Sequence, residues 1–205
     1  GWQLQGRESW PPGYAWRARR MARMVQAAIY LVRHGETPTT GKILPGRAPG
    51  LHLSGRGREQ ARKVAAQFSE VHAVYCSPLE RTRETAAPLC EKFGLEPMLC
   101  EGILEADFGS WTGASLRELA ALPEWKVVQQ RPSEFRFPGG ESFAEMQARV
   151  VDTLDEIARR HPGETVVCFS HADPIKAALT HYAGKPLDEF QQAKAAPGSV
   201  TRVQL

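Results

Sequence analysis

The chain has 205 residues, of which 42% are hydrophobic and 24% charged, values that fit one globular domain with a sizeable core. The formal net charge of +3 does not indicate a nucleic acid partner, because residues 1–24 hold five of the 26 basic residues and one of the 23 acidic residues. The remaining 21 basic and 22 acidic residues nearly cancel, and no segment is long and apolar enough to predict a membrane span.

Residues 1–24 differ in composition from the rest of the chain. They contain the turn WPPG at 10–13 and the basic run RARRMAR at 17–23. No apolar segment with a cleavage site follows this run, so the sequence does not predict a signal peptide. A basic arm for a membrane or a nucleic acid is one interpretation, but we favour a poorly ordered extension before a folded domain at 25–205.

Strand and helix patterns alternate from residue 25 onward. In chain order we predict a strand at 27–33, a helix at 57–68, a strand at 73–77, a helix at 81–93, a strand at 96–100, a helix at 142–160, a strand at 164–170, a helix at 173–183 and a strand at 199–205. Pro88 should kink or shorten the second helix, and Ser142 with Glu145 forms a capping box before the third. Apolar strands that alternate with helices are typical of a mostly parallel sheet covered on both faces, a three-layer α/β/α sandwich.

The four cysteines, Cys76, Cys90, Cys100 and Cys168, form no C-x-x-C pair. A zinc site or a thioredoxin-like motif is therefore not expected. Cys76 and Cys168 lie inside apolar strand-like runs, where a free cysteine packs as a small hydrophobe. We expect all four to be reduced, which favours a cytoplasmic location.

Basic side chains gather where the predicted strands end. The first strand ends in Arg33 and His34, the second leads to Arg81, and the strand at 164–170 is followed by His171. Ligands of parallel sheets bind beyond the carboxyl ends of the strands. Arginine matches phosphate oxygens and a neutral imidazole can attack phosphorus, so these residues predict a site for a phosphate dianion. Taken alone, Arg33 and His34 could also cap the strand and bind a surface carboxylate.

Four segments resemble the signature blocks of the histidine phosphatase superfamily, also called the phosphoglycerate mutase-like family. In the family's order they are LVRHGET at 31–37, SPLERTRETA at 77–86, LEADFGSWTG at 104–113 and SHADP at 170–174. PGGES at 138–142, before the long helix, is a further family-like feature. The resemblance covers about residues 27–205 and points to the branch of small bacterial phosphatases.

This resemblance implies a phosphoglycerate mutase-like fold without metal or cofactor, and a role for each matching residue. His34 matches the nucleophile that becomes phosphohistidine, and Glu105 matches the acid that protonates the leaving oxygen and then activates water. Arg33, Arg81 and His171 match the residues that bind the phosphoryl oxygens. Phosphoryl transfer needs charge stabilisation and a proton for a poor leaving group, which these residue types can supply. The arginines beside the histidines would also repel a metal cation.

Two positions depart from the family pattern. Thr40 stands six residues after the nucleophile, where the family often has asparagine; its hydroxyl could still donate to phosphate, so we include it among the substrate-binding residues. Ala172 replaces a common glycine. Arg83 is left out of the site, because it could pair with Glu80 or Glu84 on the same helix.

Residues 110–140 break the alternation of strands and helices. They are rich in aromatic residues and arginines. This segment could form a cap over the site that contacts the leaving group, or two short helices whose aromatic residues pack on the sheet edge.

The expected reaction is hydrolysis of a small-molecule phosphomonoester to inorganic phosphate, through phosphohistidine at His34. A phosphomutase of the phosphoglycerate mutase type is the alternative, although residues 25–205 leave little room for the longer loops of mutases. A non-catalytic phosphate-binding module is the third interpretation. The motifs identify neither the phosphomonoester nor the oligomeric state.

Overall fold

Residues 25–205 are described by the computed structural model, and a five-stranded sheet lies at their centre. The strands are β1 (Ala28–Arg33), β2 (Ala73–Cys76), β3 (Met98–Leu99), β4 (Thr165–Ser170) and β5 (Val200–Gln204). Their order in the sheet is β3-β2-β4-β1-β5, and β5 alone runs antiparallel to its neighbour, β1. The predicted, mostly parallel sheet is confirmed, whereas the predictions for residues 1–24 lie outside the described residues.

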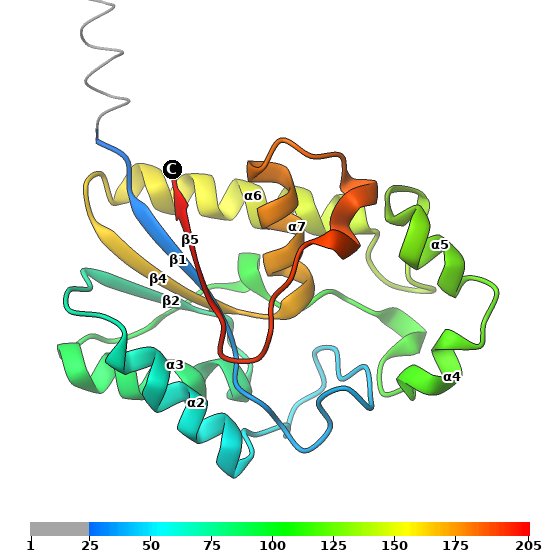
Figure 1. The fold of residues 1–205 in the computed structure, drawn as a ribbon, viewed down its shortest axis with the longest axis horizontal. Helices are drawn as coiled ribbons and strands as arrows, with labels where there is room; N and C mark the ends of the chain where they lie inside the picture. The colour runs from blue at the N-terminus through cyan, green and yellow to red at the C-terminus, as the bar shows by residue number, and fades with distance from the viewer. Residues whose placement is uncertain (1–24) are drawn as a thin grey trace, which may run out of the picture.

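Helices cover both faces of the sheet. The α-helices are α2 (Gly55–Ala66), α3 (Glu80–Phe93), α4 (Leu116–Ala120), α5 (Trp125–Gln130), α6 (Phe143–Arg160) and α7 (Ala172–Tyr182). Short 3-10 helices span Glu101–Ile103, Gly109–Trp111, Pro132–Glu134 and Leu187–Gln192. Helices α2 and α3 lie on one side of the sheet, and α6 and α7 lie on the other (Figure 1). This arrangement is the predicted three-layer α/β/α sandwich.

The two covered faces explain why the central strands are apolar throughout. In β4, Val166 and Cys168 pack with residues of α6 and α7, whereas Val167 and Phe169 pack with residues of α2 and α3. All four side chains are fully buried. Side chains along a strand alternate between the faces, so two buried faces turn the usual polar alternation into a continuous apolar run.

Helix α3 continues past Pro88 and is not shortened by it. The helix ends at Gly94, whose φ of 63° is in the left-handed region that glycine adopts readily. A proline inside a helix costs about 3 kcal/mol. Leu89 and Cys90, the next two residues, are buried, and burying a leucine returns roughly 1.5–3 kcal/mol. Packing therefore offsets most of the cost of the proline.

The predicted third strand is the least accurate of the set. Residues 96–100 were expected to be extended, but only Met98 and Leu99 pair, at the edge of the sheet beside β2. Both side chains are exposed. An edge strand has a hydrogen-bonding partner on one side only, so little fixes its length.

Residues 110–140 form the two short helices α4 and α5 around a cluster of aromatic side chains. Trp111, Phe135 and Phe137 are buried, and their ring centroids lie 5.1 to 5.7 Å apart. The packing role considered for these aromatics is therefore confirmed. Contact between this segment and a substrate stays a prediction.

Candidate active site

The carboxyl ends of β1, β2 and β4 meet at one edge of the sheet. Arg33 pairs in register with Ser170, whose carbonyl accepts a hydrogen bond from the His34 amide at 3.1 Å. The Ser77 amide donates to the Phe169 carbonyl at 3.0 Å. The residues that follow these three strands therefore lie side by side, as the sequence predicts.

His34 is held in one tautomer by the backbone of its neighbour. Its Nδ1 lies 2.7 Å from the carbonyl oxygen of Gly35. A carbonyl only accepts, so Nδ1 carries the proton and Nε2 keeps its lone pair. Burial, followed by the charges of Arg81 and Arg33, lowers the pKa of His34 to about 3. The ring is therefore neutral at pH 7, the form that can attack an electrophile.

Two glycines bring the end of β1 against the start of α2. A Cβ on Gly35 would lie 2.5 Å from the carbonyl oxygen of Gly57, and a Cβ on Gly57 would lie 2.1 Å from the carbonyl oxygen of Glu36. The Gly35 amide also donates to Thr85 Oγ1 at 3.0 Å. These contacts fix the peptide that orients the His34 ring, and only glycine fits at either position.

Arg33 and Arg81 are each anchored through one nitrogen. Arg33 Nη1 donates to the Ala195 carbonyl at 2.8 Å, and Arg81 Nη2 donates to the Gly46 carbonyl at 2.7 Å. Burial lowers the pKa of both guanidinium groups. The ordinary arginine pKa is so high that both remain charged. Two positive charges therefore stand beside the histidine with their remaining nitrogens available.

His171 lies next to His34, with 5.3 Å between the ring centroids. Its Nε2 is 2.8 Å from Ser77 Oγ, and its Nδ1 is 3.9 Å from Glu105 Oε2. Burial, followed by the charges of His34 and the two arginines, holds the pKa of His171 well below its usual value, so the ring is neutral. When the Ser77 hydroxyl donates to Nε2, the ring carries its own proton on Nδ1 and can donate it to an oxygen.

Glu105 is buried, and its carboxyl titrates near neutral pH. Burial, followed by the charge of Asp173, raises the pKa of Glu105 to about 7, although Arg81 opposes the shift. The Ala106 amide donates to its Oε1 at 2.9 Å, which leaves Oε2 on the side of His171. A carboxyl with this pKa can both give and take a proton at pH 7.

Two arginines outside the predicted set hold the loop that carries Glu105. Arg47 Nε and Arg149 Nη2 donate to the Glu105 carbonyl at 2.8 and 3.2 Å. Arg149 in turn forms an ion pair with Glu141, with 2.6 Å between Nε and Oε1. Glu141 belongs to the PGGES segment and also accepts from the Asp107 amide at 3.2 Å. That segment therefore positions the Glu105 loop.

A cavity of about 180 Å³ opens at the strand ends. Arg33, His34, Thr40 and Glu105 are among the residues that line it, whereas Arg81 and His171 are fully buried and are not among them. Thr40 Oγ1 accepts from the Thr37 amide at 2.9 Å. Its own hydrogen can point to Thr37 Oγ1, 3.2 Å away, or into the cavity.

Four buried side-chain nitrogens have no hydrogen-bond partner within residues 25–205. They are Arg33 Nε, Arg81 Nε, Arg81 Nη1 and His171 Nδ1. Buried donors are nearly always paired, because leaving one unpaired costs roughly 1–3 kcal/mol. All four belong to residues predicted to bind phosphoryl oxygens. An anion with several oxygens could pair with them together.

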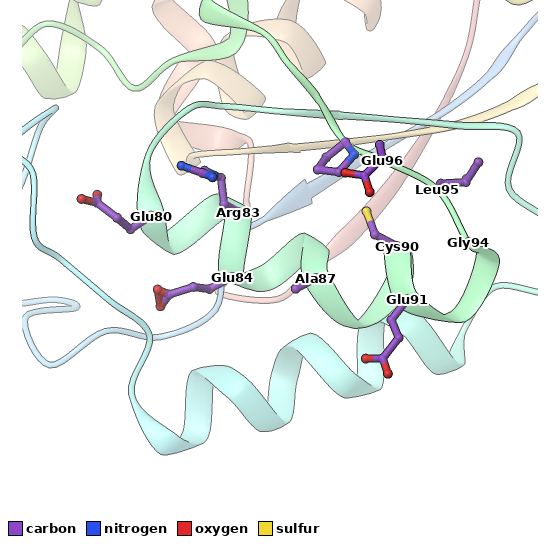
Figure 2. Close-up of a pocket in the computed structure, with 10 residues that line it drawn as sticks. Glu80, Arg83, Glu84, Ala87, Cys90, Glu91, Gly94, Leu95 and Glu96 are labelled. Atoms are coloured by element: carbon purple, nitrogen blue, oxygen red, sulfur yellow. The ribbon is translucent and has the colours of Figure 1, made fainter.

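A larger groove of about 670 Å³ runs along α3 and the segment after it, and it shares no lining residue with this cavity (Figure 2). Arg83 lines the groove, which agrees with its exclusion from the predicted site. Its acidic neighbours bind other groups: Glu80 accepts from the Gly50 amide and Glu84 from the Leu53 amide, each at 3.0 Å. Among the described residues Arg83 forms no ion pair. Glu80 and Glu84 thus hold the loop that contains Gly50 and Leu53 in place.

Sequence reasoning did not assign functions to Ser77, Arg149 and Asp173. Ser77 stands at a strand end inside a recognised block, so its position was a signal for a polar contact. Asp173 follows the second histidine by two residues, and a carboxylate so close to basic residues was a signal too. Arg149 lies on α6, 44 residues from the loop it holds, and the sequence contains no signal for that contact.

Within 25–205, no group of three or more His, Cys, Asp or Glu side chains is arranged to hold a metal ion. No helix of that part of the chain is long and apolar enough to cross a membrane.

The fold and the cluster of histidines and arginines at its strand ends define a class of phosphate-transferring α/β proteins, the histidine phosphatases. The chain belongs to the histidine phosphatase superfamily (branch 1), whose family model matches residues 29–205. It is 36% identical over 169 residues to phosphoserine phosphatase 1 of Hydrogenobacter thermophilus, a match that covers 79% of each chain. It is 32% identical over 159 residues to the metal-independent phosphoserine phosphatase of Arabidopsis thaliana, covering 73% of this chain and 66% of the relative.

Solved structures show the same fold. The phosphoserine phosphatase of Entamoeba histolytica, in complex with 3-phosphoglyceric acid, superposes with a TM-score of 0.75 at 27% identity, over 86% of this chain and 89% of that one. YhfR of Bacillus stearothermophilus superposes with a TM-score of 0.79 at 26% identity, over 86% and 90% of the two chains. The predicted family and fold are confirmed.

Proposed function

We propose that the protein hydrolyses a small-molecule phosphomonoester through a phosphohistidine intermediate at His34. The observation that carries this proposal is the set of four unpaired buried donors on Arg33, Arg81 and His171 beside a neutral imidazole. Three side chains that donate and a nucleophile that is already deprotonated match the needs of phosphoryl transfer.

The first step forms the bond between His34 Nε2 and phosphorus and breaks the bond between phosphorus and the ester oxygen. Glu105 gives its proton to that oxygen, so the product leaves as an alcohol. Arg33, Arg81 and His171 donate to the three non-bridging oxygens, where negative charge is spread in the transition state. Thr40 is a further donor to these oxygens.

The second step reverses the roles of the same groups. The Glu105 carboxylate takes a proton from water, whose oxygen attacks phosphorus and displaces His34 Nε2. Inorganic phosphate leaves, and Glu105 is again protonated. The pKa of about 7 supports both roles, because the acid and its conjugate base are then both available near neutral pH.

O-Phosphoserine is the first substrate to examine. The support is the 36% identity to a phosphoserine phosphatase over most of both chains. His34, Arg33, Arg81 and His171 would contact only the phosphoryl group, which every phosphomonoester shares, so these four residues do not select the alcohol. The alternative within the same chemistry is a phosphomutase.

The proposal is tested by replacing the nucleophile. His34→Ala should abolish hydrolysis of O-phosphoserine and p-nitrophenyl phosphate, because no neighbouring group can replace an imidazole in line with phosphorus. Alkaline quenching of the wild-type enzyme during turnover should trap a phosphoryl group on the peptide that contains His34. His52→Ala is the matched control, since His52 is exposed and bonds to Glu84 away from the cavity.

Two outcomes would contradict the proposal. Near wild-type hydrolysis by a folded His34→Ala protein would exclude the phosphohistidine route, and loss of activity in EDTA would contradict the metal-free mechanism. A separate trial with 3-phosphoglycerate, with and without 2,3-bisphosphoglycerate, distinguishes a mutase. Formation of 2-phosphoglycerate without release of phosphate would favour the mutase.

A further inference from the structure

A second cavity of about 190 Å³ adjoins the first. The two share four lining residues, Leu44, Phe108, Leu116 and Asp173. His34 and Glu105 line the first cavity, so the second is an adjoining space into which the alcohol of a bound ester could extend.

The walls of the second cavity are mostly aromatic and aliphatic. Trp125 and Phe190 are among the rings that line it, and Gln129 and Gln191 add two carboxamides. Asp173 is the one charged side chain among the described residues that line this cavity. No lysine or arginine of the described chain lines this cavity, so its wall offers no cation to a carboxylate on the alcohol.

The Asp173 carboxylate is available to a ligand in the cavity, because no other residue of 25–205 binds it. It is the second residue of α7, two positions after His171, and it lines both cavities. Its carboxylate makes no hydrogen bond or ion pair with any other residue of 25–205. Burial raises its pKa, and the nearby charges of Lys176 and Arg33 only oppose that shift, so a donor or cation in the cavity would stabilise the charged form.

The charged groups around Asp173 already bind elsewhere. Lys176 Nζ donates to Gln191 Oε1 at 2.9 Å and lies 4.4 Å from the centre of the Phe190 ring. Arg33 donates to the Ala195 carbonyl, and its Nε is one of the unpaired donors at the phosphoryl site. Glu105 is the acid proposed for the leaving oxygen. None of these groups neutralises Asp173 by direct contact.

We propose that Asp173 binds an ammonium group on the leaving alcohol, so that the preferred substrates are phosphate esters of small amino alcohols. This inference rests on the proposed phosphatase function. A charge-assisted hydrogen bond in a water-poor cavity favours the ammonium ion, and the aromatic walls favour it further. A carboxylate or a methyl group in the same place would leave Asp173 without a partner.

Two matched pairs of substrates test the preference. O-Phosphoserine and 3-phosphoglycerate differ only in an ammonium group against a hydroxyl group, and O-phosphoethanolamine and propyl phosphate differ only in an ammonium group against a methyl group. We expect kcat/KM of the wild-type enzyme to favour the ammonium ester in each pair by roughly 10- to 150-fold, the range for one hydrogen bond to a charged group.

Asp173→Asn should bring both ratios close to one, since the amide keeps the size of the side chain but loses its charge. Using ratios cancels any change that the substitution causes at Glu105, because both esters in a pair need the same proton. Asp152→Asn is the control; Asp152 is exposed on α6, and the ratios should stay at their wild-type values.

Wild-type ratios near one, or a preference for 3-phosphoglycerate, would overturn the ammonium subsite while leaving the phosphatase proposal intact. Wild-type ratios that persist in Asp173→Asn would assign the preference to another residue and overturn the role of Asp173. Should the variant fail to fold, the wild-type ratios alone still decide on the substrate class. Absence of any His34-dependent hydrolysis, including that of p-nitrophenyl phosphate, would instead overturn the proposed function.

Discussion

Glu105→Gln tests the proton transfer that we propose from Glu105 to the leaving group separately from the other proposed functions of the site. The glutamine keeps the size of the side chain and can accept from the Ala106 amide, but it cannot deliver a proton. Positioned general acids contribute 10²–10⁴-fold, equivalent to roughly 2.7–5.5 kcal/mol of activation free energy. With a pKa of about 7, about half of the Glu105 carboxyls carry the proton at pH 7. Replacing a carboxyl that is protonated in half of the molecules should therefore remove nearly all of this 10²–10⁴-fold contribution to the rate.

The assay compares two leaving groups in single turnovers. An alkyl phosphate expels a strongly basic alkoxide and needs the proton, whereas p-nitrophenyl phosphate expels a weak base. We expect the rate of His34 phosphorylation in Glu105→Gln to fall by about 10²-fold or more for the alkyl ester, and much less for the aryl ester. In the wild type the alkyl rate should also decline as the pH rises above about 7, and this decline should be absent in the variant.

Equal losses on the two substrates would refute the assignment of Glu105 as the acid. The role would then move to Asp107, the next carboxylate in the loop, whose Oδ1 accepts from the Gly109 amide at 3.0 Å. Glu101→Gln serves as the matched control, because Glu101 is exposed and precedes the same loop. Its phosphorylation rates should equal those of the wild type on both substrates.

Two further perturbations address charge and pH. Arg81→Ala should weaken competitive inhibition by orthovanadate through the loss of roughly 1.5–3 kcal/mol, about 10- to 150-fold in the inhibition constant, and unchanged inhibition would mean that Arg81 faces elsewhere. The pKa of His34 is about 3 when folded and 6.5 when unfolded, so the unfolded chain binds the extra proton and the free energy of unfolding should fall as the pH falls below 6.5. Between pH 6.5 and 5 His34→Asn should abolish about 1.6 kcal/mol of that fall, measured by urea unfolding in phosphate-free buffer. Equal pH dependence in both proteins would exclude a neutral, buried His34.

Much of the fold was predictable because both faces of the sheet are covered. Continuous apolar runs such as 164–170 have no other simple explanation at that length, and the capping box of Ser142 and Glu145 marked the start of α6. The short length of the edge strand β3 and the continuation of α3 past Pro88 were harder to predict from the sequence. Each depends on contacts with distant residues, which a local pattern does not contain.

The candidate site was predictable to the extent that strand ends bring side chains together. Arg33 is the last residue of β1, and His34 and His171 directly follow the neighbouring strands β1 and β4, so topology alone places the three residues at one edge. The hydrogen-bond partners of these residues were not predictable. The Ala195 carbonyl that holds Arg33 is 162 residues away, and any backbone carbonyl could have served, so no residue type marked it.

The unpaired donors connect the stability of the fold with the chemistry proposed for it. Each costs roughly 1–3 kcal/mol, yet they are concentrated in one place and do not occur in the rest of the described chain. Arg33 and Arg81 each pair one nitrogen with a backbone carbonyl, and their unpaired nitrogens are available to the proposed ligand. A dianion that pairs with all of them regains the cost as binding energy without reorganising the site. Preorganised donors of this kind stabilise developing charge best in a water-poor interior, which is where the strand ends place them.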